Sequence, residues 1–142
     1  MPGVDLPDSN VWLALAVEDH QHHHRARHYW EEQSGTQLAF CRVTMLGLLR
    51  LATNATVMQN RPFKPRAAWK IYRDFIALPE VLFIAEPTDI ESQFAAYSES
   101  TSFPAGRWTD AYLAAFARTT GSRIVSFDGD FRRFSDLDLL FL

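Results

Sequence analysis

Short apolar segments that favour strands alternate along this chain with segments of helical periodicity, and this alternation is the feature that most limits its possible folds. Strands are predicted at 4–6, 37–43, 81–84, 123–127 and 137–142. Helices are predicted at 10–19, 22–33, 45–53, 65–77, 88–99 and 109–120. Strands separated by single helices pair in parallel through right-handed crossovers. The sequence therefore predicts an α/β fold, a three-layer sandwich in which helices flank a central, mainly parallel sheet.

The composition fits one folded domain over residues 1–142. Hydrophobic residues make up 47% of the chain, which is enough to bury a core and argues against disorder. Cys41 is the single cysteine, which excludes a disulfide framework and a cysteine-based zinc site. No signal peptide is visible, and the first apolar run, 11–17, is too short to span a bilayer. We therefore expect a cytoplasmic protein without a membrane partner.

Four aspartates fall where predicted strands end or where a predicted helix begins. Asp8 follows the first strand, Asp128 and Asp130 follow the fourth, and Asp110 lies in the first turn of the last helix. Ligands of parallel sheets bind outside the carboxyl ends of the strands. Small residues on one face of the last helix would let it lie close to the sheet; they are Ala114, Ala117 and Gly121. We therefore expect the four carboxylates to converge.

Carboxylates held close together repel each other unless they share a cation. Mg²⁺ or Mn²⁺ suits such a site, because a hard divalent ion takes oxygen ligands and keeps several waters. The ion would activate a water and stabilise charge on a phosphodiester. It would also supply the positive charge that a polyanionic substrate requires, since the net charge of the chain is −3. Each aspartate alone could equally be a helix cap, a charge at a helix N-terminus or part of a surface turn, so this prediction depends on their joint placement.

Three stretches resemble motifs of PIN-domain toxins of the VapC type. They are LPDSNVWLAL at 6–15, WTDAYLAA at 108–115 and IVSFDGDF at 124–131. The segments 44–54 and 20–30 also look like their counterparts in the family, so the resemblance spans nearly the whole chain. It implies a PIN fold, endoribonuclease activity that hydrolyses RNA with a Mg²⁺- or Mn²⁺-activated water, a cognate VapB-like antitoxin that blocks the site, and usually a homodimer.

The resemblance also implies roles for individual residues. The positions that match the catalytic, metal-binding acids of the family are Asp8, Asp110 and Asp128. Asp130 matches a further acid of the metal site. Two positions match polar residues that line the same pocket, Asn10 and Thr44.

One position departs from the family pattern. The family usually has an acid, commonly Glu, directly after the threonine at 44, and this chain has Met45. A thioether is a poor ligand for Mg²⁺. Our hypothesis is that activity survives with reduced metal affinity, because three or four carboxylates remain. The alternative is a catalytically impaired PIN-fold binding module that sequesters RNA or its antitoxin. A phosphohydrolase with an aspartyl intermediate is disfavoured, because Asn10 stands where such enzymes commonly have a second aspartate.

Basic residues gather between 61 and 73, where they alternate with aromatic residues. Basic side chains beside stacking aromatics suit single-stranded nucleic acid. A solvated helix face with Trp69, Tyr72 and Phe75 turned toward the core explains the pattern equally well. Two further arginines lie beside Asp130 and could hold phosphates. The predicted RNA-binding residues are Arg61, Lys64, Lys70, Arg73, Arg132 and Arg133.

Five histidines lie between 20 and 28. The pairs His20/His24 and His24/His28 have the spacing that places two imidazoles on one helical face, which suits Zn²⁺ or Ni²⁺. No cysteine and no obvious third ligand accompany them. An exposed, polar start of a helix is therefore the simpler interpretation.

Overall fold

A parallel sheet forms the centre of the molecule in the computed structural model, which describes Met1 and residues 3–142. The strands in this part of the chain are β1 (Val4–Pro7), β2 (Gln37–Phe40), β3 (Val81–Phe83), β4 (Arg123–Ser126) and β5 (Leu139–Phe141). They lie in the order β3-β2-β1-β4-β5, and every neighbouring pair is parallel. The predicted parallel sheet is confirmed, with β1 at its centre.

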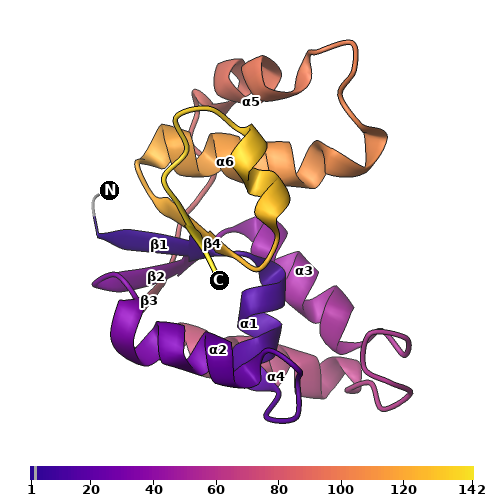
Figure 1. The fold of residues 1–142 in the computed structure, drawn as a ribbon. Helices are drawn as coiled ribbons and strands as arrows, with labels where there is room; N and C mark the ends of the chain where they lie inside the picture. The colour runs from indigo at the N-terminus through magenta and orange to yellow at the C-terminus, as the bar shows by residue number, and fades with distance from the viewer. Residues whose placement is uncertain (2) are drawn as a thin grey trace.

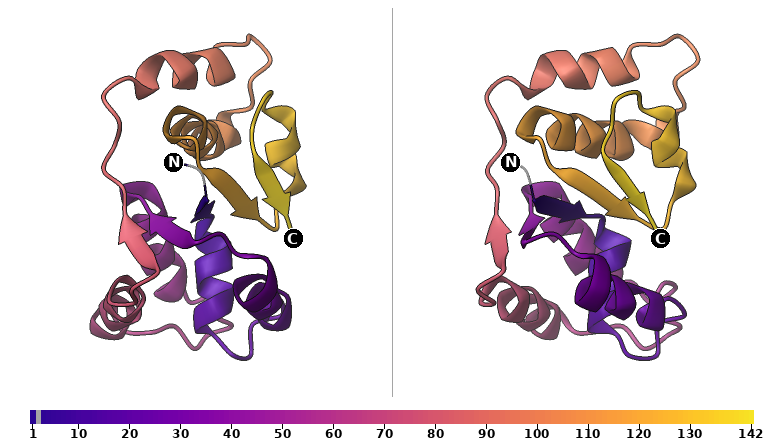
Figure 2. Two further views of the ribbon diagram at one scale, coloured as in Figure 1. Left: turned by 90° about the vertical axis from the view of Figure 1, so that its left-hand side faces the viewer. Right: turned by 60° about the vertical axis from the view of Figure 1, so that its left-hand side comes forward.

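Helices cover both faces of this sheet (Figure 1). One face carries α1 (Ser9–Ala16), α2 (His23–His28), α3 (Arg42–Ala52) and α4 (Pro65–Ile76), and the other carries α5 (Ile90–Ser98) and α6 (Trp108–Thr120). Figure 2 shows the sheet between the two sets. A separate hydrophobic cluster fills each side, one around Trp12 and Phe40 and the other around Phe116 and Phe131. The predicted three-layer α/β sandwich is confirmed. Among the described residues, no helix combines the length and apolar character that crossing a membrane requires.

Helix α3 begins earlier than the sequence predicts. The predicted strand extended to residue 43 and the helix began at 45, but β2 ends at Phe40 and α3 begins at Arg42. Cys41 is the N-cap, and the Thr44 hydroxyl accepts the backbone N–H of Cys41 over 3.0 Å. This reciprocal capping box overrides the strand preference of the apolar residues before it. Thr44 is therefore the third residue of the helix, and not its cap.

Helix α6 also begins before its predicted start. The segment expected to be a loop ends in a 3₁₀ turn, η2 (Ala105–Arg107), which runs directly into Trp108. Thr109 therefore lies inside the helix and does not cap it. Gly121 ends the helix with a φ of 70°, as predicted for a C-terminal glycine. Ala114 and Ala117 are fully buried, which confirms the predicted small-residue face of α6. The helix predicted over 22–33 is divided, because α2 ends at His28 and a π-helical turn, η1 (Tyr29–Gln33), follows it. The other boundaries differ from prediction by a turn or less.

A close helix contact fixes the chain that follows β1. A Cβ on Gly47 of α3 would lie 2.0 Å from the Ser9 Oγ of α1, so only glycine allows this approach. The Ser9 hydroxyl donates to the carbonyl oxygen of Thr44 over 3.2 Å. The residues directly after β1, including Asp8, are thereby tied to α3.

Candidate active site

Asp8 lies between the ends of β1 and β4. It is the N-cap of α1, and one carboxylate oxygen accepts the Ser9 N–H over 2.7 Å. The other accepts the hydroxyl of the fully buried Ser126, at the end of β4, over 3.1 Å. The pKa of Asp8 is raised from 3.8 to about 6, chiefly by burial and also by the nearby charges of Asp110 and Asp128, while the two hydrogen bonds oppose the shift. Asp8 is therefore a carboxylate whose negative charge the fold disfavours.

Ser126 also connects Asp8 with Asp128. The backbone N–H of Asp128 donates to the Ser126 Oγ over 2.9 Å, while that hydroxyl donates its own proton to Asp8. An Asp128 carboxylate oxygen accepts the N–H of Asp130 over 2.9 Å, at the start of the 3₁₀ turn η3 (Gly129–Arg133). The loop after β4 is thus held in a fixed position relative to the end of β1.

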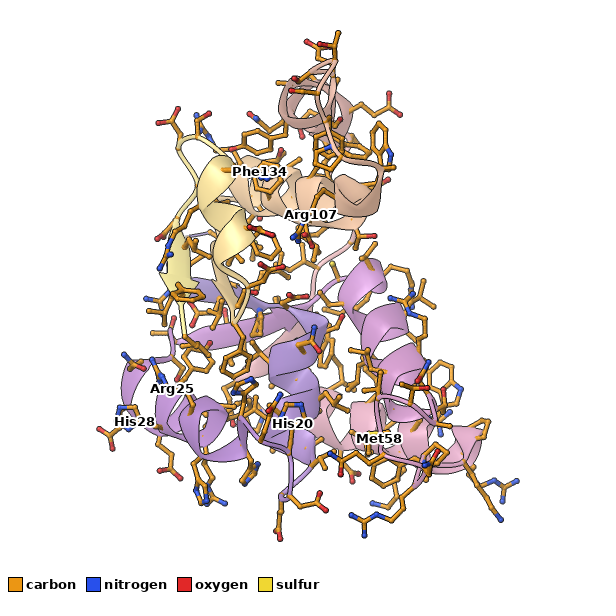
Figure 3. All side chains as sticks on the ribbon, turned by 45° about the vertical axis from the view of Figure 1, so that its right-hand side comes forward. His20, Arg25, His28, Met58, Arg107 and Phe134 are labelled. Carbon is orange, nitrogen blue, oxygen red and sulfur yellow. The ribbon has the colours of Figure 1, made fainter. Side chains whose placement is uncertain are left out.

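Arg107 lies among the remaining acids. Its Nη1 is 2.7 Å from an Asp110 oxygen and 2.8 Å from an Asp128 oxygen, and its Nη2 pairs with Asp130. These contacts raise the pKa of Arg107 above its ordinary value, chiefly through the hydrogen bond that it donates to Asp110 and then through the one that it donates to Asp128. Figure 3 shows the arginine at the start of α6, on the side of the helix that faces α1 and α3. One guanidinium thus contacts three carboxylates that come from two distant segments of the chain, and it offsets one of their three negative charges.

The cation that these carboxylates surround is the guanidinium of Arg107. Within the part of the chain that the structure describes, no three His, Cys, Asp or Glu side chains stand close enough together to hold a metal ion as they are. The guanidinium occupies the space between Asp110 and Asp128. The donors around it are carboxylate oxygens, the type that Mg²⁺ and Mn²⁺ prefer. This donor set fits a divalent ion once Arg107 withdraws.

A profile of the PIN domain matches residues 6–137. The chain belongs to the PIN-domain family. It is 38% identical over 143 residues to "Ribonuclease VapC41" of Mycobacterium tuberculosis, with 96% of this chain and 97% of the relative covered. It is 28% identical to "Ribonuclease VapC33" of the same organism, with 93% of each chain covered. The resemblance to VapC-type PIN proteins is confirmed.

Solved structures agree on this PIN fold. The crystal structure of M. tuberculosis VapC20, described as a sarcin-ricin loop cleaving toxin, superposes with a TM-score of 0.72 at 18% identity. The alignment covers 94% of this chain and 97% of VapC20. VapBC2 of Rickettsia felis, bound to a DNA fragment from its promoter, gives a TM-score of 0.65 at 13% identity, with 97% and 98% covered. At these identities the likeness establishes the fold alone.

A hollow of about 370 Å³ opens beside Asp8 and Asp128 in this PIN domain. Asn10 lines it, together with His20 and Phe127. Thr44 is not among its lining residues; it is fully buried within the capping box of α3. The contribution of Thr44 is therefore indirect, through the Ser9 contact that holds α1.

Two residues of this site were not predicted from the sequence. Arg107 lies three residues before Asp110, a spacing at which helical side chains meet, and that spacing was the available signal. Ser126 ends β4 two residues before Asp128, but nothing in the sequence indicates that its hydroxyl faces Asp8.

Met45 lies in the core and not among the acids. It is 6% exposed and belongs to the hydrophobic cluster around Trp12. The Nη1 of Arg42 lies 2.9 Å from its sulfur. Met45 therefore gives apolar packing at the position where the resemblance implies an acid.

The predicted RNA-binding residues lie in three places. Arg132 and Arg133 are in η3, next to the acids, and Arg132 also stacks on Phe141 at 4.2 Å. Arg61 lines a second hollow, described below, and Lys64 is the N-cap of α4. On α4, Lys70 pairs with Asp74 over 2.7 Å, and Arg73 stacks on Trp69. Tyr72 is buried and Phe75 partly buried, as the helix-face interpretation expects, but Trp69, which it also turned toward the core, is exposed.

Two of the histidines, His24 and His28, lie on one exposed face of α2. Helix α2 begins at His23, so His20 lies outside it and does not share a helical face with His24. His23 is buried, and its Nδ1 lies 2.7 Å from the carbonyl oxygen of Ala14. His22 stacks on Phe127, with ring centroids 4.5 Å apart. Two histidines thus support the wall of the candidate site.

Proposed function

We propose that this chain is a Mg²⁺- or Mn²⁺-dependent endoribonuclease, a single domain over residues 1–142 that acts as the toxin of a toxin–antitoxin pair. The observation that carries the proposal is the convergence of three carboxylates on Arg107 beside the partly buried Asp8. An acidic site of this kind needs a cation. The names of the relatives, ribonucleases of the VapC type, support RNA as the substrate.

In this proposal Asp8, Asp110 and Asp128 hold the ion, and Asp130 has a supporting role. A bound divalent ion supplies an acidified water and stabilises charge on the phosphodiester. With a pKa of about 6, Asp8 is mostly ionised at neutral pH and available as a ligand. Ser126 orients Asp8 and Asp128 relative to each other. Asn10 lines the space in which the phosphodiester would lie.

Arg107 and the ion compete for the same carboxylates. Its Nη1 contacts Asp110 and Asp128 together, so the guanidinium has to leave before an ion can bind between them. Once released, it joins Arg132 and Arg133 as a cation near the RNA backbone, where arginine binds phosphate well. The same side chain would then offset part of the negative charge of the site without metal, and would hold substrate once the metal is bound.

The proposal includes a cognate VapB-like antitoxin and a homodimer. Leu46 on α3 and Trp108 on α6 are each 52% exposed. Large apolar side chains with this exposure are typical of surfaces that a protein partner covers.

The test is cleavage of a structured RNA by the purified protein in Mg²⁺ or Mn²⁺, with EDTA as a control. Cleavage should require the metal and should disappear in a folded Asp8→Asn variant. Asp136→Asn is the matched control, because Asp136 is exposed and its φ of 57° suits asparagine. Cleavage that persists in Asp8→Asn would contradict the role assigned to Asp8.

A non-catalytic binding module is the second candidate. Two observations favour it: Met45 is buried at the position where the resemblance implies an acid, and Arg107 already occupies the space between Asp110 and Asp128. In that case the protein would bind RNA or its antitoxin without cutting RNA. Metal-dependent turnover separates the two candidates, and RNA binding without cleavage in either metal would favour the module.

A further inference from the structure

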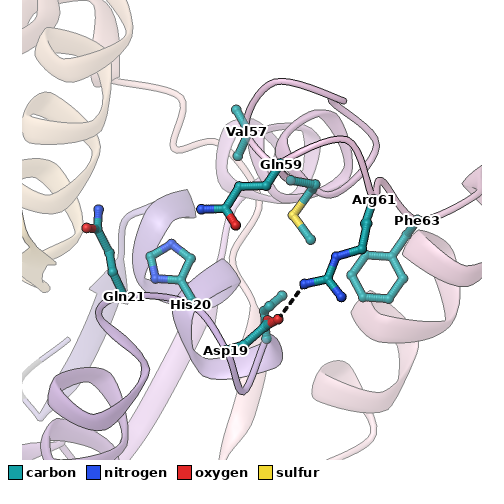
Figure 4. A pocket seen from close by; sticks show the side chains of 9 residues that line it. Asp19, His20, Gln21, Val57, Gln59, Arg61 and Phe63 are labelled. Atoms are coloured by element: carbon teal, nitrogen blue, oxygen red, sulfur yellow. Dashed lines mark hydrogen bonds and ion pairs between the residues drawn. The ribbon is translucent and has the colours of Figure 1, made fainter.

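A second hollow, of about 420 Å³, adjoins the candidate active site (Figure 4). Its walls come from the connection between α1 and α2 and from the segment between α3 and α4. His20 and Gln21 line both this hollow and the one beside Asp8. The two spaces therefore share a wall, and an extended ligand can occupy both. Figure 3 shows His20 and Met58, which both line the second hollow, on the same side of the molecule.

The lining of the second hollow combines rings, amides and one cation. Phe63 and His20 contribute rings, and burial lowers the pKa of His20, with the neighbouring His22 and His23 adding to the effect. A neutral imidazole offers an uncharged face for stacking. The amides of Gln21 and Gln59 each carry donors and an acceptor, which match the edges of nucleobases. In Figure 4 the Gln59 amide is directed toward the His20 ring.

Arg61 supplies the cation at the edge of this hollow. It pairs with Asp19 over 2.8 Å, and the two side chains are 76% and 68% exposed. An ion pair with this exposure is weak, so an RNA phosphate can displace the Asp19 carboxylate. The same pair connects the two walls of the hollow while no ligand is bound (Figure 4).

The segment that carries Gln59 has an unusual and fixed backbone. Gln59 and Asn60 have φ values of 52° and 63°, a region that residues other than glycine rarely adopt. Backbone hydrogen bonds hold the turn, among them Asn60 N–H to the Ala55 carbonyl over 2.7 Å. Gln59 is exposed, so core packing does not require its conformation. Such backbone conformations concentrate at ligand sites.

We propose that this hollow binds one nucleotide of single-stranded RNA next to the phosphodiester at the acidic site. The base stacks against the rings of His20 and Phe63, its edge bonds to Gln59 and its phosphate to Arg61. The RNA backbone then crosses the shared wall toward Asp8. The inference rests on the proposed function, since it identifies a substrate subsite of the same enzyme. Rings, amides and an arginine together are typical of proteins that bind single-stranded RNA.

The test measures binding of a fluorescein-labelled single-stranded RNA hexamer in EDTA, where metal-dependent cleavage is blocked. Gln59→Gly removes the amide and relieves the backbone, so it leaves the fold intact. Asn60→Gly is the matched control, because it relieves the adjacent residue, which does not line the hollow. We expect Gln59→Gly to weaken binding about fivefold and Asn60→Gly to leave it unchanged. Equal effects of the two variants, or no effect of either, would overturn the inference.

A second pair of variants tests the ring. His20→Ala should weaken binding of the hexamer about tenfold through lost stacking, whereas His28→Ala, on the exposed side of α2, should not. Uridine or adenosine monophosphate should compete with the hexamer at lower concentration than ribose 5-phosphate does. Equal competition by ribose 5-phosphate would reduce the hollow to a phosphate site and overturn the assignment of the base.

Cleavage of the same hexamer in Mn²⁺ separates this inference from the proposed function. RNA that binds through Gln59 but is not cut would overturn the nuclease and keep the subsite. RNA that is cut equally well by wild type and Gln59→Gly would keep the nuclease and overturn the subsite. Loss of antitoxin binding alone in Gln59→Gly would assign the hollow to the antitoxin, which also overturns the inference.

Discussion

Asp8→Asn should make the protein more stable at neutral pH while it abolishes metal-dependent cleavage. Asparagine keeps the shape of the side chain. Its amide oxygen can still accept the Ser9 N–H, and its amide NH2 can donate to the Ser126 hydroxyl oxygen, which reverses that second hydrogen bond. It carries no charge, however. Because burial raises the pKa of Asp8 to about 6, the ionised carboxylate destabilises the folded protein, and the substitution removes that effect.

The sign and the size of the effect follow from this pKa. A carboxyl with a higher pKa in the folded than in the unfolded state holds its proton more tightly when folded. The free energy of unfolding therefore falls as the pH rises from about 4 to about 6, and it stays lower above that range. A shift from 3.8 to about 6 corresponds to about 3 kcal/mol. Because Asp8 is only partly buried, solvent screens part of the effect, and we expect about 1–3 kcal/mol.

Urea denaturation in EDTA measures this difference. At pH 7, Asp8→Asn should unfold at higher urea concentration than wild type, with an unchanged slope. At pH 4 the difference should nearly vanish, because the wild-type carboxyl is then protonated in the folded state. Added Mg²⁺ should stabilise wild type and not the variant. A variant less stable than wild type at pH 7, or an equal difference at both pH values, would refute the reasoning.

Three further substitutions test other parts of the structure. Arg107→Gln should bind Mg²⁺ about tenfold more tightly in calorimetry, because three ion pairs worth about 0.5 kcal/mol each no longer have to break. Unchanged or weaker binding would contradict the proposed competition between Arg107 and the metal ion for the carboxylates. Asp5→Asn should cost about 3 kcal/mol of stability in thermal unfolding, since Asp5 is 2% exposed and accepts hydrogen bonds from Arg123 and Tyr29; a loss below about 1 kcal/mol would show that this pair matters little. Met45→Glu should lower stability in thermal unfolding, because it buries a carboxylate in the cluster around Trp12; if it instead raises both the affinity for Mg²⁺ and the cleavage rate, Met45 stands where a ligand was lost.

The sequence was sufficient to predict the three layers of the fold and the edge of the sheet at which the acids lie. Strand and helix periodicity predicted the parallel sheet, and the carboxyl ends of its strands then located Asp8 and Asp128. Contacts made in three dimensions were not predictable. The segment before Trp108, which contains Arg107, was predicted to be a loop. Arg107 contacts Asp128, and this contact depends on where β4 ends in three dimensions. The start of α3 was predicted too late because the apolar residues around Cys41 favour a strand locally. The capping box between Cys41 and Thr44 forms only after the helix has formed, so local propensity does not predict it.

No pattern in the sequence predicted the second hollow. Its walls are the connection between α1 and α2 and the segment between α3 and α4, which are far apart along the chain. His20 lies between the two predicted helices, as it lies between α1 and α2 in the structure, and the sequence does not indicate which side chains it faces. Arg61 and Phe63 looked like part of one basic and aromatic stretch with α4, but they face the turn that contains Asp19. Side chains on connections are positioned by the elements at both ends, and local propensity carries little information about them.

The Ser126 contact has a consequence for the protein during its synthesis. Asp8 and Ser126 are 118 positions apart, and β1 is at the centre of the sheet only because β4 pairs with it. Contacts at such separation form late, since the chain that joins them has to close first. A nascent chain leaves the ribosome from its N-terminus, so Asp8 is synthesised long before its partners at 126 and 128. The acidic centre therefore cannot assemble on an incomplete chain, and a ribonuclease built in this way would be inert toward the RNA of the ribosome that is making it.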